Sequence, residues 1–508
     1  MKQYQYIKTL ALGGLALFSL ASCSLDYEPI SQPSEITQGT QTEENTAVLK
    51  DKAAAESQLK SLYELFKNRQ EHAHLDYLLI GDSHSDNAYA GTTGAEVVPY
   101  ETNTIDASNS VLSRDWNRYL EDIAKANVLI NGVEQLKENG QVSEAEYHTY
   151  KAQGEIFRAL MMFRMARLWG SFPVITTIAK TITSDNIEEV YPTYYPPRKT
   201  PKECYEQIIA DLTDAEQYAP NFDNADRTIM SKTVAQAMLA KVYAEKEVQD
   251  YDKVITYADK VINTSGLKLE EDFETLWGYD ETTKDCVKRN TSEGILEVHW
   301  PIGGGNWETW MYGRQLDNWD YYFTWAKWIT PSRDLINDFE KEGDEVRKNQ
   351  TIVYYDCTWS NYYPASHYPF MYKLRSGYSN EYWVRLADII LIKAEAEAYK
   401  GNLSESASLV NQIRQRAKLK DLTSDKTSSK EAMIEAVLHE RRLELALEGE
   451  RWFDLCRNNK LEEYLNDIDN RDSGRIKQQK KFDSNSYLLP IPQTALDQNT
   501  NLEQNPGY

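Results

Sequence analysis

A charged and apolar run near the C-terminus, residues 440–457, reads ERRLELALEGERWFDLCR. On a helix its apolar side chains share one stripe, and oppositely charged residues three apart meet on the surface. The pairs expected to meet are Arg441–Glu444, Glu448–Arg451 and Asp454–Arg457. Gly449 inside such a helix costs about 1 kcal/mol relative to alanine, which predicts close packing there or a break in the helix. The pattern favours a structural helix crossed by ion pairs over a catalytic carboxylate.

Elsewhere, carboxylates and histidines form no recognisable catalytic or metal-binding motif. Retaining glycoside hydrolysis needs two carboxyl groups about 5 Å apart, and no spacing among the 79 acidic residues marks such a pair. His72 and His74 are two residues apart, so a helix would point them to different sides. The sequence has no HExxH zinc motif and no Gly-x-Ser-x-Gly elbow. We therefore predict no catalytic residues, no metal and no cofactor.

Tryptophans gather in an irregular stretch, residues 299–328, that holds six of the 12 in the chain: Trp300, Trp307, Trp310, Trp319, Trp325 and Trp328. Three consecutive glycines, residues 303–305, indicate a loop. No Lys-Ser/Thr follows them, so this is not a phosphate-binding loop. The aromatic rings could form a second core, or an exposed platform on which sugar rings stack for roughly 1 kcal/mol each. Binding is favoured for the cluster as a whole, because core aromatics are usually Phe and only Phe323 lies among these tryptophans.

Composition and charge narrow the function classes. The chain has 508 residues, 41% hydrophobic and 27% charged, which is typical of a globular protein with more than one packed region. The net charge of −23 argues against nucleic acid as a partner, because phosphate binding needs Lys and Arg. The 34 Tyr and 12 Trp stand against 12 Phe. Tyr and Trp combine an apolar face with a hydrogen-bonding edge, which suits the binding of a polar ligand.

The N-terminus has the pattern of an export signal. Basic Lys2 and Lys8 precede an apolar run, residues 10–21, that is too short to span a bilayer of about 30 Å. The run ends in Leu-Ala-Ser-Cys, and small residues before Cys23 are typical of a bacterial lipobox. We predict a signal peptide over residues 1–22, acylation of Cys23, and a tether over residues 23–45.

The remaining cysteines are Cys204, Cys286, Cys357 and Cys456. They are widely spaced and form no CxxC, so a metal site built from them is not expected. Export permits a disulfide, but the sequence does not indicate which cysteines would pair.

Helical periodicity covers most of the rest of the chain. Apolar residues recur at spacings of three and four over residues 46–70, 116–130 and 154–174, and the last helix is expected to stop at Gly170 and Pro173. Residues 391–417 read as a helical hairpin turned at Gly401-Asn402. Small residues placed where its two helices touch resemble tetratricopeptide units, although a clean 34-residue period is missing.

Several segments together resemble one family in order along the chain. Besides the lipobox and ERRLELALEGERWFDLCR, they are WNRYLEDIAKANVLI (residues 116–130), GEIFRALMMFRMARLWGSFPV (154–174), ITPSRDLINDFEKEGDEVR (329–347), WVRLADIILIKAEA (383–396) and YLLPIPQTALDQNTNLEQNPGY (487–508). By these motifs the chain is identified as a member of the SusD/RagB family of nutrient-binding outer-membrane lipoproteins.

This resemblance implies a mainly α fold, a tetratricopeptide-like helical bundle with a large, irregular, loop-rich insertion that carries the ligand site. We expect an N-terminal helical region over residues 46–265. The Trp-rich ligand-binding region would span residues 266–382, and a C-terminal helical region with a closing tail would span residues 383–508.

Relatives place ligand residues in the irregular region and in the loop before the helix that contains Trp116. The resemblance transfers this by region only, because the contact residues have no motif. The candidates for ligand binding are Trp307, Trp310, Trp319, Tyr321, Tyr89, Asn87 and Asp86.

The function that the resemblance implies is capture of an oligosaccharide at the cell surface. The protein would be lipid-anchored in the outer membrane and pass the glycan to a SusC-like TonB-dependent transporter. A RagB-like peptide-binding lipoprotein, a docking subunit that binds little ligand of its own and, more remotely, a glycoside hydrolase remain as alternatives.

Overall fold

The computed structural model describes residues 49–91, 94–283, 285–300, 305–306, 308–313 and 327–508. Several predictions lie outside the described residues: the signal peptide, Cys23 and the whole tether, and the candidate ligand residues Trp307, Trp319 and Tyr321.

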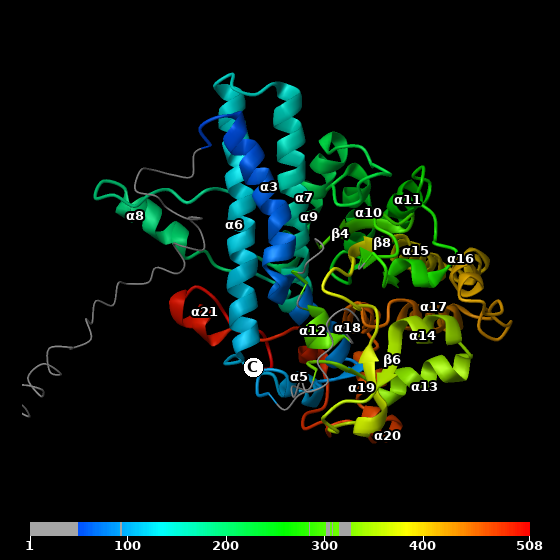
Figure 1. Ribbon diagram of the computed structural model, residues 1–508. Helices are drawn as coiled ribbons and strands as arrows, with labels where there is room; N and C mark the ends of the chain where they lie inside the picture. Colours follow the sequence, from blue (N-terminus) through cyan, green and yellow to red (C-terminus); the bar gives the residue numbers. More distant parts are fainter. Residues whose placement is uncertain (1–48, 92–93, 284, 301–304, 307, 314–326) are drawn as a thin grey trace, which may run out of the picture.

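The described chain is mainly helical, which confirms the predicted fold class. Its long helices are α3 (Lys52–Asn68), α6 (Ser110–Glu138), α7 (Glu144–Trp169), α9 (Pro201–Tyr218), α10 (Lys232–Ala244), α11 (Tyr251–Ile262), α15 (Leu386–Lys400), α16 (Leu403–Arg416) and α17 (Lys430–Glu444). In this order each helix from α3 to α16 packs on the next, and α17 packs on both α15 and α16 (Figure 1). The tetratricopeptide-like character of this series stays a prediction.

Local sequence explains where the helices begin and end. The Ser143 hydroxyl accepts a hydrogen bond from the Glu146 amide, and the Glu146 carboxylate accepts one from the Ser143 amide. This capping box begins α7. The helix ends where predicted, at Gly170, which takes a φ of 72°. The predicted hairpin is also confirmed, because α15 ends at Gly401 with a φ of 85° and α16 begins after Asn402.

The segment over residues 440–457 is not one helix, so that part of the expectation is wrong. Helix α17 ends at Glu444 and α18 (Arg451–Arg457) begins seven residues later. Gly449 lies in the break with a φ of 81°, and Gly81 approaches its backbone closely. Close packing and a helix break were the two predicted alternatives, and both occur at Gly449.

Ion pairs along this segment are mostly long-range. Asp454 and Arg457 pair at 2.8 Å as predicted. The other two predicted pairs are wrong, because their members bind partners on other segments. Arg441 pairs with Asp388 and Asp454, Glu448 with Lys373 and Arg385, Glu444 with Arg347, Arg385 and Arg416, and Arg451 with Asp86.

Between the helices, the described residues form four two-stranded antiparallel sheets. The pairs are β1 (Ala88–Tyr89) with β5 (Thr330–Pro331), β2 (Tyr279–Asp280) with β3 (Asp285–Cys286), β4 (Gly294–Val298) with β8 (Glu381–Arg385), and β6 (Ile352–Tyr355) with β7 (Tyr368–Met371). β8 runs directly into α15, so the β4–β8 pair joins the irregular region to the helical series.

Short elements complete the description. The α-helices are α4 (Asp76–Leu78), α5 (Val98–Thr102), α8 (Ile187–Val190), α12 (Glu308–Tyr312), α13 (Arg333–Glu342), α14 (Glu345–Thr351), α19 (Leu461–Leu465), α20 (Ile468–Arg471) and α21 (Gln493–Gln498). The π-helical turns are η1 (Glu71–Leu75) and η2 (Leu79–Ser83), and the 3₁₀ turns are η3 (Tyr191–Tyr194), η4 (Phe273–Leu276), η5 (Ala365–His367) and η6 (Ser484–Tyr487). Among the described residues, no helix is both long and apolar enough to cross a membrane.

One large hydrophobic cluster fills the interior and draws on all three regions proposed from the sequence. Leu62 and Trp169 belong to the first region, Tyr312 to the second, and Leu391 and Trp452 to the third. The division into residues 46–265, 266–382 and 383–508 stays a proposal, and the core does not separate along it.

Candidate functional site

Among the four candidate ligand residues that the structure describes, Trp310 is the one that reaches the surface. It lies on the short helix α12, and 38% of its surface is exposed, which is unusual for so large an apolar side chain. The residues before and after it on the helix, Thr309 and Met311, are buried. Helix α12 therefore presents one indole outward from an otherwise buried turn.

Contacts with three other segments hold α12 in place. The Thr309 hydroxyl donates to the Ser376 carbonyl at 2.7 Å, and the Trp328 amide donates to the Met311 carbonyl at 3.1 Å. The Tyr312 hydroxyl donates to the carbonyl of Leu75. A ligand stacked on Trp310 would therefore meet a ring whose backbone is already fixed.

The other tryptophans of this stretch that the structure describes are less exposed. Trp300 is buried and packs its ring edgewise against the His74 ring, and Trp328 is half-buried. Trp300 is therefore a core residue, whereas the exposure of Trp310 fits an aromatic platform on which a sugar could stack.

The loop that carries Asp86, Asn87 and Tyr89 does adjoin the Trp-rich stretch. Strand β1, which contains Tyr89, pairs with β5, and Tyr89 lies opposite Thr330. The resemblance implied that these two regions share a site, and they meet here through their backbones. The three side chains, however, are buried, with at most 1% of their surface exposed.

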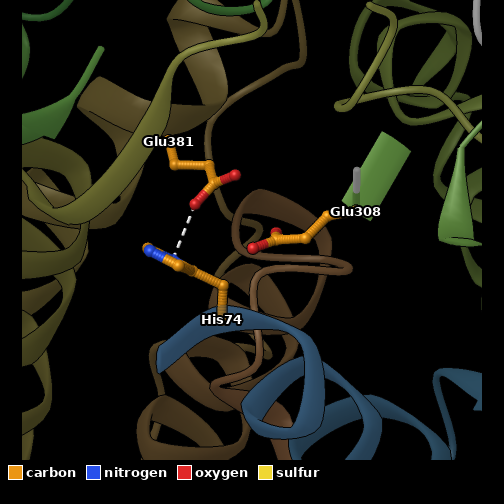
Figure 2. Close-up of side chains that lie close together, drawn as sticks. All are labelled: His74, Glu308 and Glu381. Carbon is orange, nitrogen blue, oxygen red and sulfur yellow. Dashed lines mark ion pairs between the residues drawn. The ribbon is translucent and has the colours of Figure 1, made fainter. Parts of the chain in front are cut away.

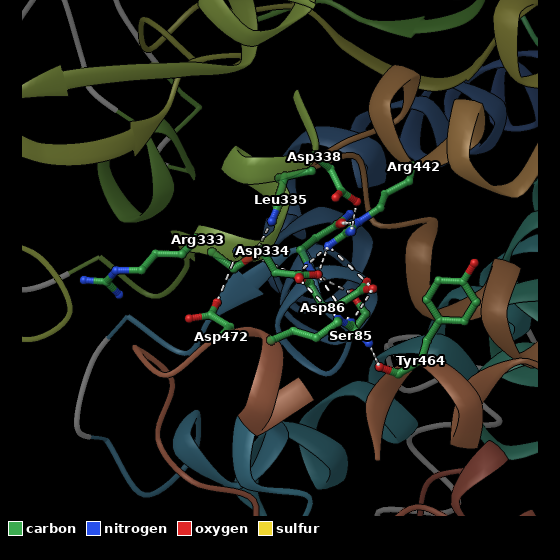
Figure 3. Close-up of polar contacts among 12 residues, drawn as sticks. Ser85, Asp86, Arg333, Asp334, Leu335, Asp338, Arg442, Tyr464 and Asp472 are labelled. Carbon is green, nitrogen blue, oxygen red and sulfur yellow. Dashed lines mark hydrogen bonds and ion pairs between the residues drawn. The ribbon is translucent and has the colours of Figure 1, made fainter. Parts of the chain in front are cut away.

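Asp86 takes part in a buried ionic network with Arg442 and Asp334 (Figure 3), and Asn87 is hydrogen-bonded to the same Arg442. The Arg451 guanidinium donates two hydrogen bonds to the Asp86 carboxylate, at 2.8 and 2.9 Å, and Arg442 donates to the Asn87 side-chain oxygen at 3.0 Å. Burial acts to raise the pKa of Asp86, but Arg442 and Arg451 hold it below its ordinary value. The carboxylate is thus charged and neutralised inside the protein.

Tyr89 has a similar structural position. Its hydroxyl donates to the Asp472 carboxylate at 2.7 Å and accepts a hydrogen bond from the Arg333 amide at 2.9 Å. Its ring stacks on Tyr362 with 4.5 Å between ring centroids. The structure does not bring Asp86, Asn87 or Tyr89 to the surface beside Trp310, and ligand contact by these three stays a prediction.

A buried group of His74, Glu308 and Glu381 has no counterpart in the sequence analysis (Figure 2). His74 lies on η1, Glu308 begins α12 and Glu381 begins β8, and His74 Nδ1 is 2.6 Å from Glu381 Oε2. Burial and the neighbouring Glu381 raise the pKa of Glu308 well above its ordinary value. No spacing rule could have found the group, because its members come from three separate segments.

The four cysteines after the tether are free thiols. Cys204 is buried, and burial raises its pKa to about 11, which leaves little reactive thiolate near neutral pH. The sequence permitted a disulfide, and the structure has none among these four cysteines.

Comparison with known proteins gives two family matches. A model described as "SusD family" matches residues 367–508, and a model described as "Starch-binding associating with outer membrane" matches residues 34–244. Among relatives, SusD-like protein P2 of Formosa agariphila is 28% identical and covers 85% of this chain and 88% of its own. A SusD-like protein of Bacteroides ovatus is 26% identical over 74% of this chain and 70% of its own.

Solved structures share the fold. A SusD superfamily protein from Bacteroides vulgatus has a TM-score of 0.73 at 22% identity and covers 91% of this chain and 100% of its own. A structure named as a laminarin-binding SusD-like protein has a TM-score of 0.70 at 22% identity, with 90% and 100% covered.

Proposed function

The chain belongs to the SusD/RagB family, and from that premise we propose that it is a lipid-anchored glycan-binding protein of the cell surface. It captures an oligosaccharide and delivers it to a SusC-like TonB-dependent transporter in the outer membrane. It carries out no chemistry on the glycan.

The exposed indole of Trp310 is the single observation that carries the glycan proposal. A sugar ring offers a face of C–H bonds that stacks on such a surface, and hydroxyls around it can bond to nearby polar groups. Trp307, Trp319 and Tyr321 belong to the same stretch of sequence and complete the proposed aromatic platform.

One family match and one structural neighbour support a glycan as the ligand class. One matching family is described as starch-binding, and one structural neighbour is named for laminarin binding. The acidic chain, with a net charge of −23, also suits an uncharged ligand better than a polyanionic one.

Membrane attachment and the transporter partner are the remaining parts of the proposal. The lipobox pattern before Cys23 supports acylation of that cysteine, and the description of one matching family supports association with the outer membrane. The partner is proposed from family membership, with the helical series as the docking face.

The test is a titration of the purified protein with laminarin, starch oligosaccharides and a set of peptides. Trp310→Ala should weaken binding of the preferred glycan about fivefold, because one stacked ring contributes about 1 kcal/mol. Tyr191→Ala is the matched control, since Tyr191 is 51% exposed and follows α8, which projects at the left of Figure 1. Trp307→Ala tests the part of the platform outside the described residues.

Three results would overturn parts of the proposal. Equal affinity of wild type and Trp310→Ala for every glycan would remove Trp310 from the site. Binding of peptides alone would favour the RagB-like alternative. Release of shorter sugars during the titration would show a glycoside hydrolase.

A further inference from the structure

The buried group of His74, Glu308 and Glu381 has the composition of a metal-binding site. One donor atom from each residue lies within 4.8 Å of the others. Glu308 is fully buried, and His74 and Glu381 are each 8% exposed. Figure 2 shows the three side chains pointing toward one another from separate segments of the chain.

Glu308 differs from most buried carboxylates of this protein. Neither of its carboxyl oxygens has a hydrogen-bond partner among the described residues, whereas Asp86 receives two bonds from Arg451. Arg164 lies near Glu308, but its guanidinium donates to the Ala73 carbonyl and stacks 3.7 Å above the Trp383 ring. Arg164 offsets part of the charge of Glu308 but makes no hydrogen bond to it. A buried carboxylate without full compensation costs several kcal/mol, so a proton or a bound cation would complete the compensation.

The hydrogen bonds around the group leave its free donor atoms facing inward. His74 Nε2 lies 2.8 Å from the Phe66 carbonyl, which can only accept, so this nitrogen carries the ring proton. Nδ1 lies 2.6 Å from Glu381 Oε2, so it is the ring nitrogen on the side of the two carboxyl groups. Asn306 donates to the other oxygen of Glu381, Oε1. Outer contacts of this kind orient metal ligands in proteins.

The donor set indicates the class of ion. One imidazole nitrogen with two carboxylate oxygens suits zinc and its neighbours, whereas Mg²⁺ and Ca²⁺ prefer oxygen ligands alone. A divalent ion would balance the two carboxylates. It would also replace the direct contact of Nδ1 with Oε2, which lie 2.6 Å apart.

We propose that His74, Glu308 and Glu381 bind one divalent transition-metal ion of the zinc class. The ion joins η1, α12 and β8, and its role is structural because it links three side chains that are each more than nine-tenths buried. Trp310 lies two residues after Glu308 on the same helix, so the metal fixes the turn that presents the indole.

The test uses zinc alone as the probe. Full-length protein is stripped with a chelator and titrated with ZnCl₂ by calorimetry, with thermal unfolding followed in parallel. Wild type should bind one ion per chain and unfold at a higher temperature with zinc present. X-ray absorption should find nitrogen and oxygen neighbours at about 2.0–2.2 Å from the zinc.

Variants identify the site. Glu308→Gln and Glu381→Gln should each lose the high-affinity ion and the zinc-dependent rise in unfolding temperature. Glu342→Gln is the control, since Glu342 also lies beside a histidine, His439, at 3.3 Å, but belongs to no three-residue cluster of this kind among the described residues. It should bind zinc as wild type does.

A proton shared between Glu308 and Glu381 is the competing explanation. It predicts no stoichiometric zinc in wild type, and a Glu308→Gln protein at least as stable as wild type with or without zinc. That result would overturn the proposal, and so would zinc binding that survives in both glutamine variants. Neither result bears on glycan binding, which the titration with Trp310→Ala tests separately.

Discussion

Asp86 is a fully buried carboxylate whose charge is offset by the guanidinium groups of Arg442, Arg451 and Arg471. These arginines lie more than 350 residues further along the chain. Through these ion pairs, the Asp86 carboxylate links the loop before β1 to helices α17, α18 and α20. Because burial removes the screening of water, each group depends on the others for compensation.

Asp86→Asn should therefore lower the free energy of unfolding by about 3–5 kcal/mol, since it leaves buried arginines without their partner. Urea unfolding measures the loss. Asp185→Asn, at an exposed aspartate, should change stability by no more than about 0.5 kcal/mol. The folded Asp86→Asn protein should retain the glycan affinity of wild type. A normal stability with lost affinity would return Asp86 to the ligand site.

At the residue scale, the sequence predicted the structural role of charged residues better than it predicted their partners. It predicted that charges over residues 440–457 serve structure, and the network around Glu444 and Asp454 is structural. It could not predict that Arg441 pairs with Asp388, because that contact depends on how α15 and α17 pack. The burial of Asp86 and the grouping of His74 with Glu308 also depend on tertiary packing, so the sequence alone could not predict them.

The turn between α17 and α18 depends on glycine for two reasons. Gly449 has a φ of 81°, a region that side chains rarely adopt, and a Cβ there would lie 2.8 Å from the Tyr77 ring. Gly401, after α15, has nearly the same φ of 85° but has open space around it. The two glycines share the backbone conformation and differ in packing.

Gly401→Ala should cost about 1–2 kcal/mol of stability, the strain of the left-handed conformation. Gly449→Ala should cost a further 1–3 kcal/mol or so, because the methyl group also overpacks the contact with Tyr77. Denaturant unfolding of both variants separates the two contributions. Equal losses would mean that the α17–α18 turn adjusts without strain.

At the element scale, long periodic helices were the predictable part of the fold. The end of α7 at Gly170 and the hairpin at Gly401 follow from local signals that act whatever the tertiary context. Helix α12 was not predictable, because its five residues are held by contacts with Leu75, Ser376 and Trp328, not by their own periodicity. Helix α12 carries Trp310, so the candidate site lies on an element that the sequence did not predict.

In the whole molecule, buried ion pairs cross between the segments that the two family models match. Arg167 on α7 pairs with Glu450 at 3.1 Å, and Lys241 on α10 pairs with Asp388 on α15 at 2.5 Å and with Glu450 at 3.0 Å. The hydrophobic core is likewise continuous across both segments. Neither segment can complete its interior without the other.

Unfolding in urea should therefore be one cooperative transition. Midpoints followed by far-UV circular dichroism and by tryptophan fluorescence should coincide, because helices and tryptophans share one core. Glu450→Gln should lower both midpoints together. A fluorescence transition at lower urea would mean that the Trp-rich region unfolds on its own, as the three-region division permits.

The pairing of Arg167 with Glu450 spans 283 residues. A ribosome adding roughly 5–20 residues per second needs some tens of seconds to cover that interval. Until Glu450 is synthesised, Arg167, and later Lys241, lack the carboxylate that they share. Glu245 and Asp388, their other partners, are synthesised earlier. Water must take the place of Glu450 until that residue emerges, so the nascent chain cannot complete its interior early.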